Sequence, residues 1–116
     1  MPPTSTSVAT EKQLRRDLAA AYRLAARFGW DDTLYTHFSA RLPSRRGRER
    51  FLLNPFGLMF NEVRASDLIV VDLDGHVLEG DAPMNPAGFT IHSAVHSARE
   101  DAHCVLHTHT APGMAV

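Results

Sequence analysis

A chain of 116 residues that is 44% apolar and 22% charged has the length and balance of one globular domain. Its net charge of −1 excludes a general attraction to nucleic acid or anionic lipid, and no apolar run reaches the ~20 residues of a membrane span. Cys104 can form no internal disulfide, and the first residues show no signal-peptide pattern. We therefore expect a cytoplasmic protein that binds neither nucleic acid nor membrane.

The first predicted element is a helix. Residues 1–9 are polar and contain prolines, so we expect a flexible tail there and a domain over residues 10–116. Thr10 and Gln13 have the spacing of a capping box, in which each side chain satisfies a free backbone donor. Apolar residues then recur at helical spacing up to Phe28, and Gly29 is placed to end the helix.

The pattern changes to that of strands from Thr33 onward. Residues 33–42, TLYTHFSARL, are rich in β-branched and aromatic side chains, and residues 50–54, RFLLN, are typical of a partner strand. Five arginines crowd the intervening stretch, which Pro43 and Gly47 interrupt. A solvated loop is the favoured interpretation of this stretch, and an anion contact is the alternative.

A second hairpin is predicted further along the chain. An apolar strand from Leu68 to Leu73 and a return strand from His76 to Glu79 flank Asp74-Gly75, a pair that favours a type I′ turn. Because tight hairpins force antiparallel neighbours, these elements predict an α/β fold in which helices pack on a mixed sheet.

Two helices and a strand are predicted for the rest of the chain. A helix follows MNPAG, and AHCVLHTH reads as a buried strand, with Cys104 as a small core residue. Thr110 and Pro112 have the pattern of a cap and first turn of a third helix. The apolar face expected for the earlier helix consists of Phe89, Ile91, Ala94, Val95 and Ala98.

His107 and His109 are the strongest candidates for a functional site. Side chains alternate along a strand, so both imidazoles project to the same face and can converge on one divalent ion. A catalytic zinc ion would need at least one more protein ligand and an open position. The alternative is a pair of hydrogen-bonding residues at a strand end.

Other histidines are weaker candidates. His92 and His96 stand four residues apart on the second helix, a spacing that suits a metal, but a structural role is favoured because one helix face must be core. His37, in YTHFS, is the only single histidine whose surroundings suggest a site.

Four segments together resemble the class II aldolase/adducin family. They are FGWDDTLYTHFSARLP, FLLNPFGLMFNEVRASDLIVVDLDG, MNPAGFTIHSAVHSARED and CVLHTHTAPG, which span about residues 11 to 116 in the family's order and spacing. The resemblance implies an α/β fold with three α/β/α layers and a central, mainly antiparallel sheet, of which this chain is the N-terminal part. It also implies a homo-oligomer, commonly a tetramer.

The resemblance further implies a metal site. Enzymatic members act in carbohydrate metabolism on sugar phosphates or related acids, with Zn²⁺ or another divalent metal as cofactor. Two of the family's three metal-ligating histidines match His107 and His109. The third has no counterpart here, because the sequence stops at Val116.

This sequence also departs from the aldolase pattern. Gly88 stands where the aldolases carry an acid/base glutamate, which leaves His37 as a candidate for the catalytic role. The segments YTHFS, NPFGL and NPA differ from the aldolases' phosphate-binding turns and are closer to the adducin-type branch. The residues in or beside these turns that the resemblance implies for substrate binding are Thr36, Asn54 and Gly57.

Three functions therefore stay open. The first, which the resemblance favours for a full-length member, is a metal-dependent lyase acting on a small sugar-derived or hydroxy-carbonyl substrate by aldol cleavage or decarboxylation. The second is a non-enzymatic, adducin-like protein-interaction module of the cytoskeletal, actin-associated type. The third is a fragment that binds nothing productively. Because the third metal ligand is missing, we expect the 116-residue chain alone to be catalytically inactive.

Overall fold

The computed structural model describes the backbone of residues 7–110 and the side chains of residues 11–110. Helices and strands follow one another along this part of the chain in a mixed order. They are α1 (Ser7–Arg27), β1 (His37–Arg45), β2 (Arg48–Leu53), the 3-10 helices η1 (Phe60–Glu62) and η2 (Ala65–Asp67), β3 (Ile69–Asp72), β4 (Val77–Glu79), α2 (Pro86–Ala98) and β5 (Cys104–His107).

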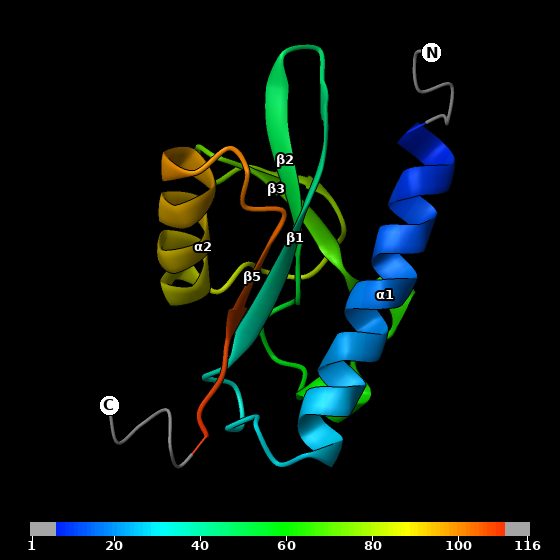
Figure 1. The fold of residues 1–116 in the computed structure, drawn as a ribbon, viewed down its shortest axis with the longest axis vertical. Coiled ribbons are helices and arrows are strands. Elements are labelled where there is room, and N and C mark those ends of the chain that lie inside the picture. The colour runs from blue at the N-terminus through cyan, green and yellow to red at the C-terminus, as the bar shows by residue number, and fades with distance from the viewer. Residues whose placement is uncertain (1–6, 111–116) are drawn as a thin grey trace.

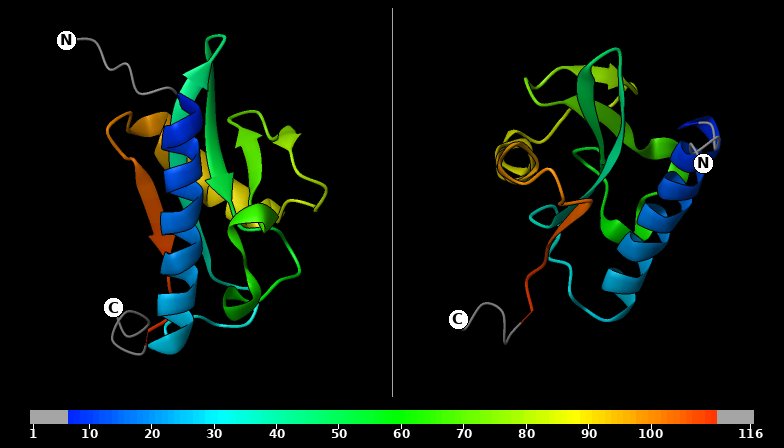
Figure 2. Two further views of the ribbon diagram at one scale, coloured as in Figure 1. Left: turned by 90° about the vertical axis from the view of Figure 1, so that its right-hand side faces the viewer. Right: turned by 45° about the horizontal axis from the view of Figure 1, so that its top comes forward.

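The strands form one sheet in the order β4-β3-β2-β1-β5, and every pairing in it is antiparallel. α1 lies on one face of the sheet and α2 on the other (Figures 1 and 2). This arrangement confirms the predicted three-layer α/β/α fold. The sheet is antiparallel throughout rather than mixed, because β1 and β5 also pair antiparallel, across a connection that contains α2.

Side-chain alternation gives the sheet two different faces. On the α1 side, Tyr22 of α1 stacks on Phe38, and Leu52 and Val70 complete a continuous apolar core. On the α2 side the apolar cluster is smaller and consists of Phe51, Leu53, Ile69 and Val71, with Phe89 of α2 packed against it. The remainder of that face, at the start of β1, is polar.

α1 starts earlier than the sequence predicts. The helix begins at Ser7, so Thr10 lies inside it and the predicted capping box is wrong; residues 1–6 of the predicted tail lie outside the described residues. Its end is as predicted. Gly29 has φ +73°, its N–H donates to the carbonyl of Ala26, and the N–H of Trp30 donates to that of Ala25. These two bonds form a Schellman motif.

The type I′ turn lies in a different hairpin from the predicted one. Arg46 and Gly47, between β1 and β2, both have positive φ, at 55° and 73°, as that turn requires. At the predicted position Gly75 has φ +93° but Asp74 is not in the positive region. The buried carboxylate of Asp72 instead closes that hairpin by accepting the backbone N–H groups of Asp74 and His76.

β5 is an edge strand and not the buried strand that its composition predicts. Cys104 is exposed, and 56% of Leu106 is accessible to solvent. The reason is that β5 pairs only with β1 in the described part of the chain. The helix predicted to start at Thr110 falls on residues 111–116, which lie outside the described residues.

The buried face of α2 also differs from the predicted apolar face. Ile91, Ala94 and Ala98 are exposed, whereas the residues buried on this helix are Gly88, His92 and His96. Imidazoles are tolerated there because the β1 side chains opposite them are polar and offer hydrogen bonds. The helix starts at Pro86, and the Asn85 side chain caps it by accepting the N–H of Ala87.

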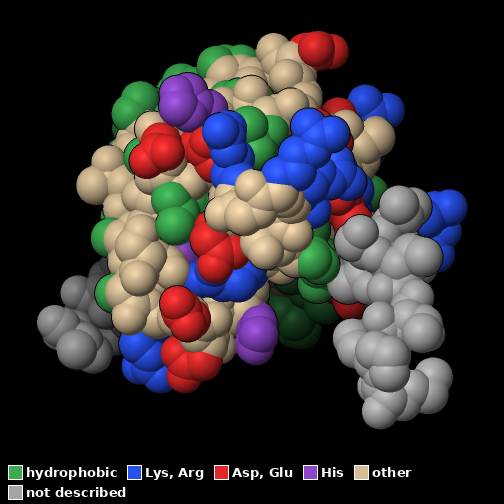
Figure 3. Space-filling view, turned by 90° about the horizontal axis from the view of Figure 1, so that it is seen from above, with side chains coloured by type: hydrophobic (Ala, Val, Ile, Leu, Met, Phe, Trp, Pro, Cys, Tyr) green, Lys and Arg blue, Asp and Glu red, His purple; other side chains and the backbone are tan. Residues whose placement is uncertain are grey.

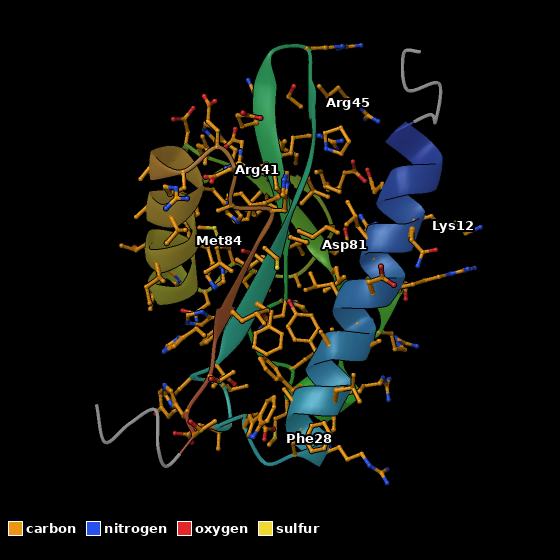
Figure 4. The ribbon with its side chains drawn as sticks, viewed as in Figure 1. Lys12, Phe28, Arg41, Arg45, Asp81 and Met84 are labelled. Carbon is orange, nitrogen blue, oxygen red and sulfur yellow. The ribbon has the colours of Figure 1, made fainter. Side chains whose placement is uncertain are left out.

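Two of the five arginines expected in a solvated loop are anchored in the fold. Arg50 is 3% exposed and forms ion pairs with Glu11 of α1 and Glu79 of β4. Arg41 donates to the carbonyls of His96, Arg99 and Ala102, and so caps the end of α2 (Figure 4). Arg50 therefore links the sheet to α1 and to its edge strand β4, and Arg41 links the sheet to the end of α2.

Basic side chains gather around the tip of the β1–β2 hairpin (Figure 3). A shallow hollow there is lined by Arg45, Arg46, Arg48, Arg50 and Leu78. Within the described residues, neither α-helix combines the length and apolar character needed to cross a bilayer.

Candidate metal centre

His37 and His107 face each other across two paired strands. His37 is the first residue of β1, and His107, the last residue of β5, is its partner in the antiparallel register. His109 lies beyond the strand, where its backbone N–H donates to the carbonyl of Trp30. This backbone bond fixes the segment after β5 against the loop that follows α1.

The rings of His107 and His109 converge, as the sequence predicts. Their Nε2 atoms lie 3.2 Å apart. Two nitrogens at this separation, each ~2.0–2.1 Å from a zinc ion, subtend roughly 100° at that ion, close to the tetrahedral angle that zinc prefers. The separation of the two nitrogens is therefore compatible with one divalent ion bound between them.

The other nitrogen of each ring has a partner as well. Nδ1 of His109 donates to Oδ2 of Asp32 over 2.9 Å, and Nδ1 of His107 lies 3.2 Å from Nε2 of His37. Histidines that bind metals almost always engage their second nitrogen in this way, because the bond fixes the tautomer and the ring orientation. The donor set therefore fits a divalent metal held through the two Nε2 atoms.

Hydrogen bonds continue from His37 into the interior between β1 and α2. Nδ1 of His37 lies 2.9 Å from Nε2 of His92. The Ser39 hydroxyl then lies 2.5 Å from Nδ1 of His92 and 2.9 Å from Nε2 of His96. Nδ1 of His96 is buried and has no hydrogen-bond partner among the described residues. We call this series from His107 to His96 the histidine chain.

Burial keeps the inner rings neutral at neutral pH. The pKa of His37 is lowered to about 4, first by burial and then by the nearby His107 and His109. Burial likewise lowers the pKa of His92 to about 3 and that of His96 to about 4, with His37 and Arg41 as the next causes, respectively. The pKa of His107 is also lowered, first by burial and then by His109.

A pocket of about 630 Å³ opens beside the converging pair. Its wall is largely apolar, and none of the described residues that line it is a lysine or arginine. The lining residues outside the histidines are Thr33, Leu34, Tyr35, Phe56, Asn85, Ala87 and Ile91.

None of the three predicted substrate-binding residues is among the residues that line this pocket. The Thr36 hydroxyl accepts the backbone N–H of Asp32, and Oδ1 of Asn54 accepts the N–H of Phe38. Both side chains are buried, and Gly57 forms a turn with φ +110°. A substrate contact at these three positions stays a prediction.

A second group of possible metal ligands lies in the β3–β4 hairpin and comprises Asp72, Asp74 and His76. The carboxylate of Asp72 is already engaged by two backbone N–H groups, by Nδ1 of His76 and by Arg48. These bonds explain why the three side chains lie close together, because they stabilise the turn of the hairpin.

Comparison with known proteins decides the family. Residues 16–116 match the model of the Class II Aldolase and Adducin N-terminal domain. The chain belongs to the class II aldolase and adducin family. The match confirms the family predicted from the sequence.

Relatives within this family carry different names. A Pseudomonas aeruginosa protein named as a class 2 aldolase is 60% identical over 93% of this chain and 41% of its own length. Mouse alpha-adducin is 49% identical over 91% of this chain and 15% of its own length. The solved structure of L-fuculose 1-phosphate aldolase from Glaciozyma antarctica has a TM-score of 0.86 at 39% identity, over 99% of this chain and 47% of that one.

The chain thus spans less than half the length of these family members. In this member, His37 fills the space beside Gly88. A Cβ atom added at Gly88 would lie 3.2 Å from Cδ2 and 3.3 Å from Cγ of the His37 ring. The imidazole therefore occupies the place that a longer side chain at position 88 would need.

The sequence analysis singled out His107, His109 and His37 but missed the side chains that contact them. Nothing in the segment around Asp32 marks it as the partner of His109. A signal existed for the others, because His37 and Ser39 share a face of β1, and His92 and His96 share a face of α2. Only the packing of α2 on β1 shows that these two faces meet.

Proposed function

We propose that His107 and His109 hold a divalent metal, zinc being the first candidate, in the site of a metal-dependent lyase. The observation that supports this best is the pair of Nε2 atoms 3.2 Å apart beside an open pocket. Asp32 and His37 engage the second nitrogen of each ring. A mere strand-end pair would need neither the convergence nor these two partners.

The bound metal would supply electrophilic stabilisation of an enediolate formed when a carbon–carbon bond breaks. The residues of the chain orient the reaction. Asp32 and His37 hold the two ligand rings, and both nitrogens of His37 are already engaged. We therefore assign His37 a positioning role instead of the acid/base role considered from the sequence.

The pocket wall indicates the class of substrate. Tyr35, Phe56 and Ile91 give the pocket an apolar lining, and the described lining offers no cationic side chain to a phosphate. A small, unphosphorylated hydroxy-carbonyl compound fits this wall better than a sugar phosphate. We also propose a cytoplasmic location and a homo-oligomeric state, for which the resemblance to the family implies a tetramer.

Calorimetric titration with zinc tests the metal site. We expect one zinc ion per chain, and we expect His107→Ala to abolish binding. The matched control is His103→Ala, at an exposed histidine outside the cluster, which should bind zinc like the wild type. Zinc binding that survives His107→Ala would refute the assignment of the ligands.

Binding of an enediolate mimic tests the chemistry. Glycolohydroxamate, an unphosphorylated chelator, should bind the zinc-loaded chain and not the metal-free chain. Its phosphorylated counterpart should bind no more tightly, because the described lining has no cation for the phosphate. Preference for the phosphorylated compound would count against the proposed substrate class.

A second candidate function, an interaction module, is favoured by an apolar groove on the α1 side. Its lining includes Leu24 in the last turn of α1, Phe28 and Trp30 just after the helix, and Leu106 of β5. All four side chains are exposed. Sedimentation velocity tests this role. Leu106→Glu should weaken self-association, whereas Val77→Glu, at the exposed β4 edge, should not.

A further inference from the structure

The histidine chain has two possible directions of hydrogen bonding. Each neutral imidazole carries one proton, so each ring donates from one nitrogen and accepts at the other. The contacts from His107 to His96 are all of the ring-to-ring or ring-to-hydroxyl kind. Between directly bonded rings, the proton position on one therefore dictates the proton position on the next. Across Ser39 the link depends on the single hydroxyl proton, which among the described residues has only His92 and His96 as acceptors.

A metal on Nε2 of His107 selects one direction. That nitrogen must then offer its lone pair, so the proton of His107 sits on Nδ1 and is donated to Nε2 of His37. His37 in turn donates from Nδ1 to His92, and His92 donates from Nδ1 to the Ser39 hydroxyl. The Ser39 hydroxyl then donates to Nε2 of His96.

The opposite direction is incompatible with the metal. If His96 donated from Nε2 to Ser39 and the Ser39 hydroxyl donated its own proton to Nδ1 of His92, each later bond would reverse and His107 would carry its proton on Nε2. That N–H would point at Nε2 of His109, into the place of the ion. The direction of hydrogen bonding along the histidine chain therefore decides whether Nε2 of His107 has a free lone pair for the metal.

We infer that His37, His92, Ser39 and His96 form a buried positioning relay that fixes the tautomer of His107, so that metal binding sets the proton position on every ring as far as His96. The inference rests on the proposed metal site. It adds that residues of α2 with no access to the pocket, His92 and His96, take part in metal binding through their protons. The lowered pKa values of the buried His92 and His96 support it, because only neutral rings have tautomers.

Nitrogen-15 NMR of histidine-labelled protein tests the relay, since two-bond couplings distinguish the Nδ1–H from the Nε2–H tautomer. With one equivalent of zinc, we expect His37, His92 and His96 all to carry the proton on Nδ1. An Nε2–H tautomer on any of them, while His107 and His109 respond to zinc, would overturn the relay and leave the metal site intact. Zinc that perturbs neither His107 nor His109 would overturn both proposals.

Variants at two positions provide a second readout. His92→Gln keeps an acceptor for the Nδ1–H of His37, whereas His92→Phe removes it. We expect the phenylalanine variant to lose zinc affinity by about tenfold, the lower end of the effect of outer-shell partners, and the glutamine variant to lose clearly less. Equal affinities of these two variants would contradict the relay. Thermal melts without metal establish that both fold, and the wild-type NMR decides the question if either does not.

Ser39→Ala cuts the relay between His92 and His96. With zinc bound, the Nδ1–H tautomers of His37 and His92 should persist, and His96 should lose its single tautomer. If His96 kept the Nδ1–H form without the hydroxyl, its proton would be set by something other than the relay, and the inference would fail at that step.

Discussion

Oδ2 of Asp32 accepts a hydrogen bond from Nδ1 of His109 over 2.9 Å, and the other nitrogen of the same ring points at His107. Asp32 follows α1 in the sequence, and His109 follows β5, so the contact joins two loops 77 positions apart. The carboxylate both orients the ring and makes its free nitrogen a better donor to a cation.

Asp32→Asn is expected to weaken zinc binding by about 10- to 100-fold, the usual effect of removing an outer-shell carboxylate. The metal-free stability should change little, because the Asp32 side chain is 46% exposed. Calorimetric titration and thermal melts measure the two quantities. Asp31→Asn, at the neighbouring residue, is the matched control and should bind zinc normally; an equal loss in both variants would show a general charge effect.

Gly88→Ala should separate helix stability from metal binding. Alanine favours the helix by up to about 1 kcal/mol over glycine, but its Cβ would press on the His37 ring at 3.2 Å. We expect an unchanged or higher melting temperature together with weaker zinc binding. Ser93→Ala, at a half-buried position on the same helix, should leave zinc binding unchanged. Zinc affinity that is intact in Gly88→Ala would show that His37 need not stay in place.

The metal-free protein should lose stability as the pH falls below about 6.5. The folded-state pKa values of His92 and His96, about 3 and about 4, lie below their ordinary value of 6.5. Their contribution is therefore complete above pH 6.5 and is lost as the pH falls toward 4, because the unfolded chain binds the protons first.

The expected loss is about 1.4 kcal/mol per pH unit for each ring, or at most about 4 kcal/mol for the pair between pH 7 and pH 5. Urea unfolding at a series of pH values measures it. A His96→Gln variant should show a shallower profile, and the exposed His103→Gln should match the wild type. A flat wild-type profile from pH 7 to 5 would mean that these rings are not kept neutral by burial.

Gly80→Ala should destabilise the fold by about 2 kcal/mol or more, as strain and overpacking do. Gly80 has φ +111°, and an added Cβ would lie 2.7 Å from Cγ2 of the buried Ile69. Gly47→Ala is the control, because its φ is +73° but nothing lies within 4 Å of the added atom. Urea unfolding should therefore show a smaller loss for Gly47→Ala, and the reverse order would contradict the steric argument.

Local patterns predicted the elements well where one interaction dominates. The end of α1 follows from Gly29, and the β3–β4 hairpin follows from two apolar runs around Asp74-Gly75. The prediction failed where a distant partner decides. Cys104 and Leu106 have the composition of a buried strand, yet β5 has one neighbour in the described sheet, which no local pattern reveals.

The same distinction applies to the site. The sequence analysis predicted the convergence of His107 and His109 from strand alternation, but β5 ends at His107. His109 lies beyond the strand, and its backbone bond to Trp30 holds it in place there. The sequence analysis assigned the buried histidines of α2 a structural role on a core helix face. It could not give them His37 and Ser39 as partners, because these residues stand more than 50 positions earlier. Asp32 was missed because loop conformation, and not residue spacing, brings it to His109.

Arg41 extends the pattern in which side chains of β1 meet α2. His37, Ser39 and Arg41 stand two apart on the strand, and they meet successive turns of the helix, the last at the carbonyl of His96. Two strand residues advance by about 6.6 Å and four helical residues by 6.0 Å, so the steps stay matched over this short distance. A one-residue insertion after Phe38 would turn Ser39 and Arg41 toward the apolar core on the α1 side and would break their contacts with α2 at the same time. We therefore expect this contact between β1 and α2 to tolerate the substitution of single side chains far better than the insertion or deletion of a residue.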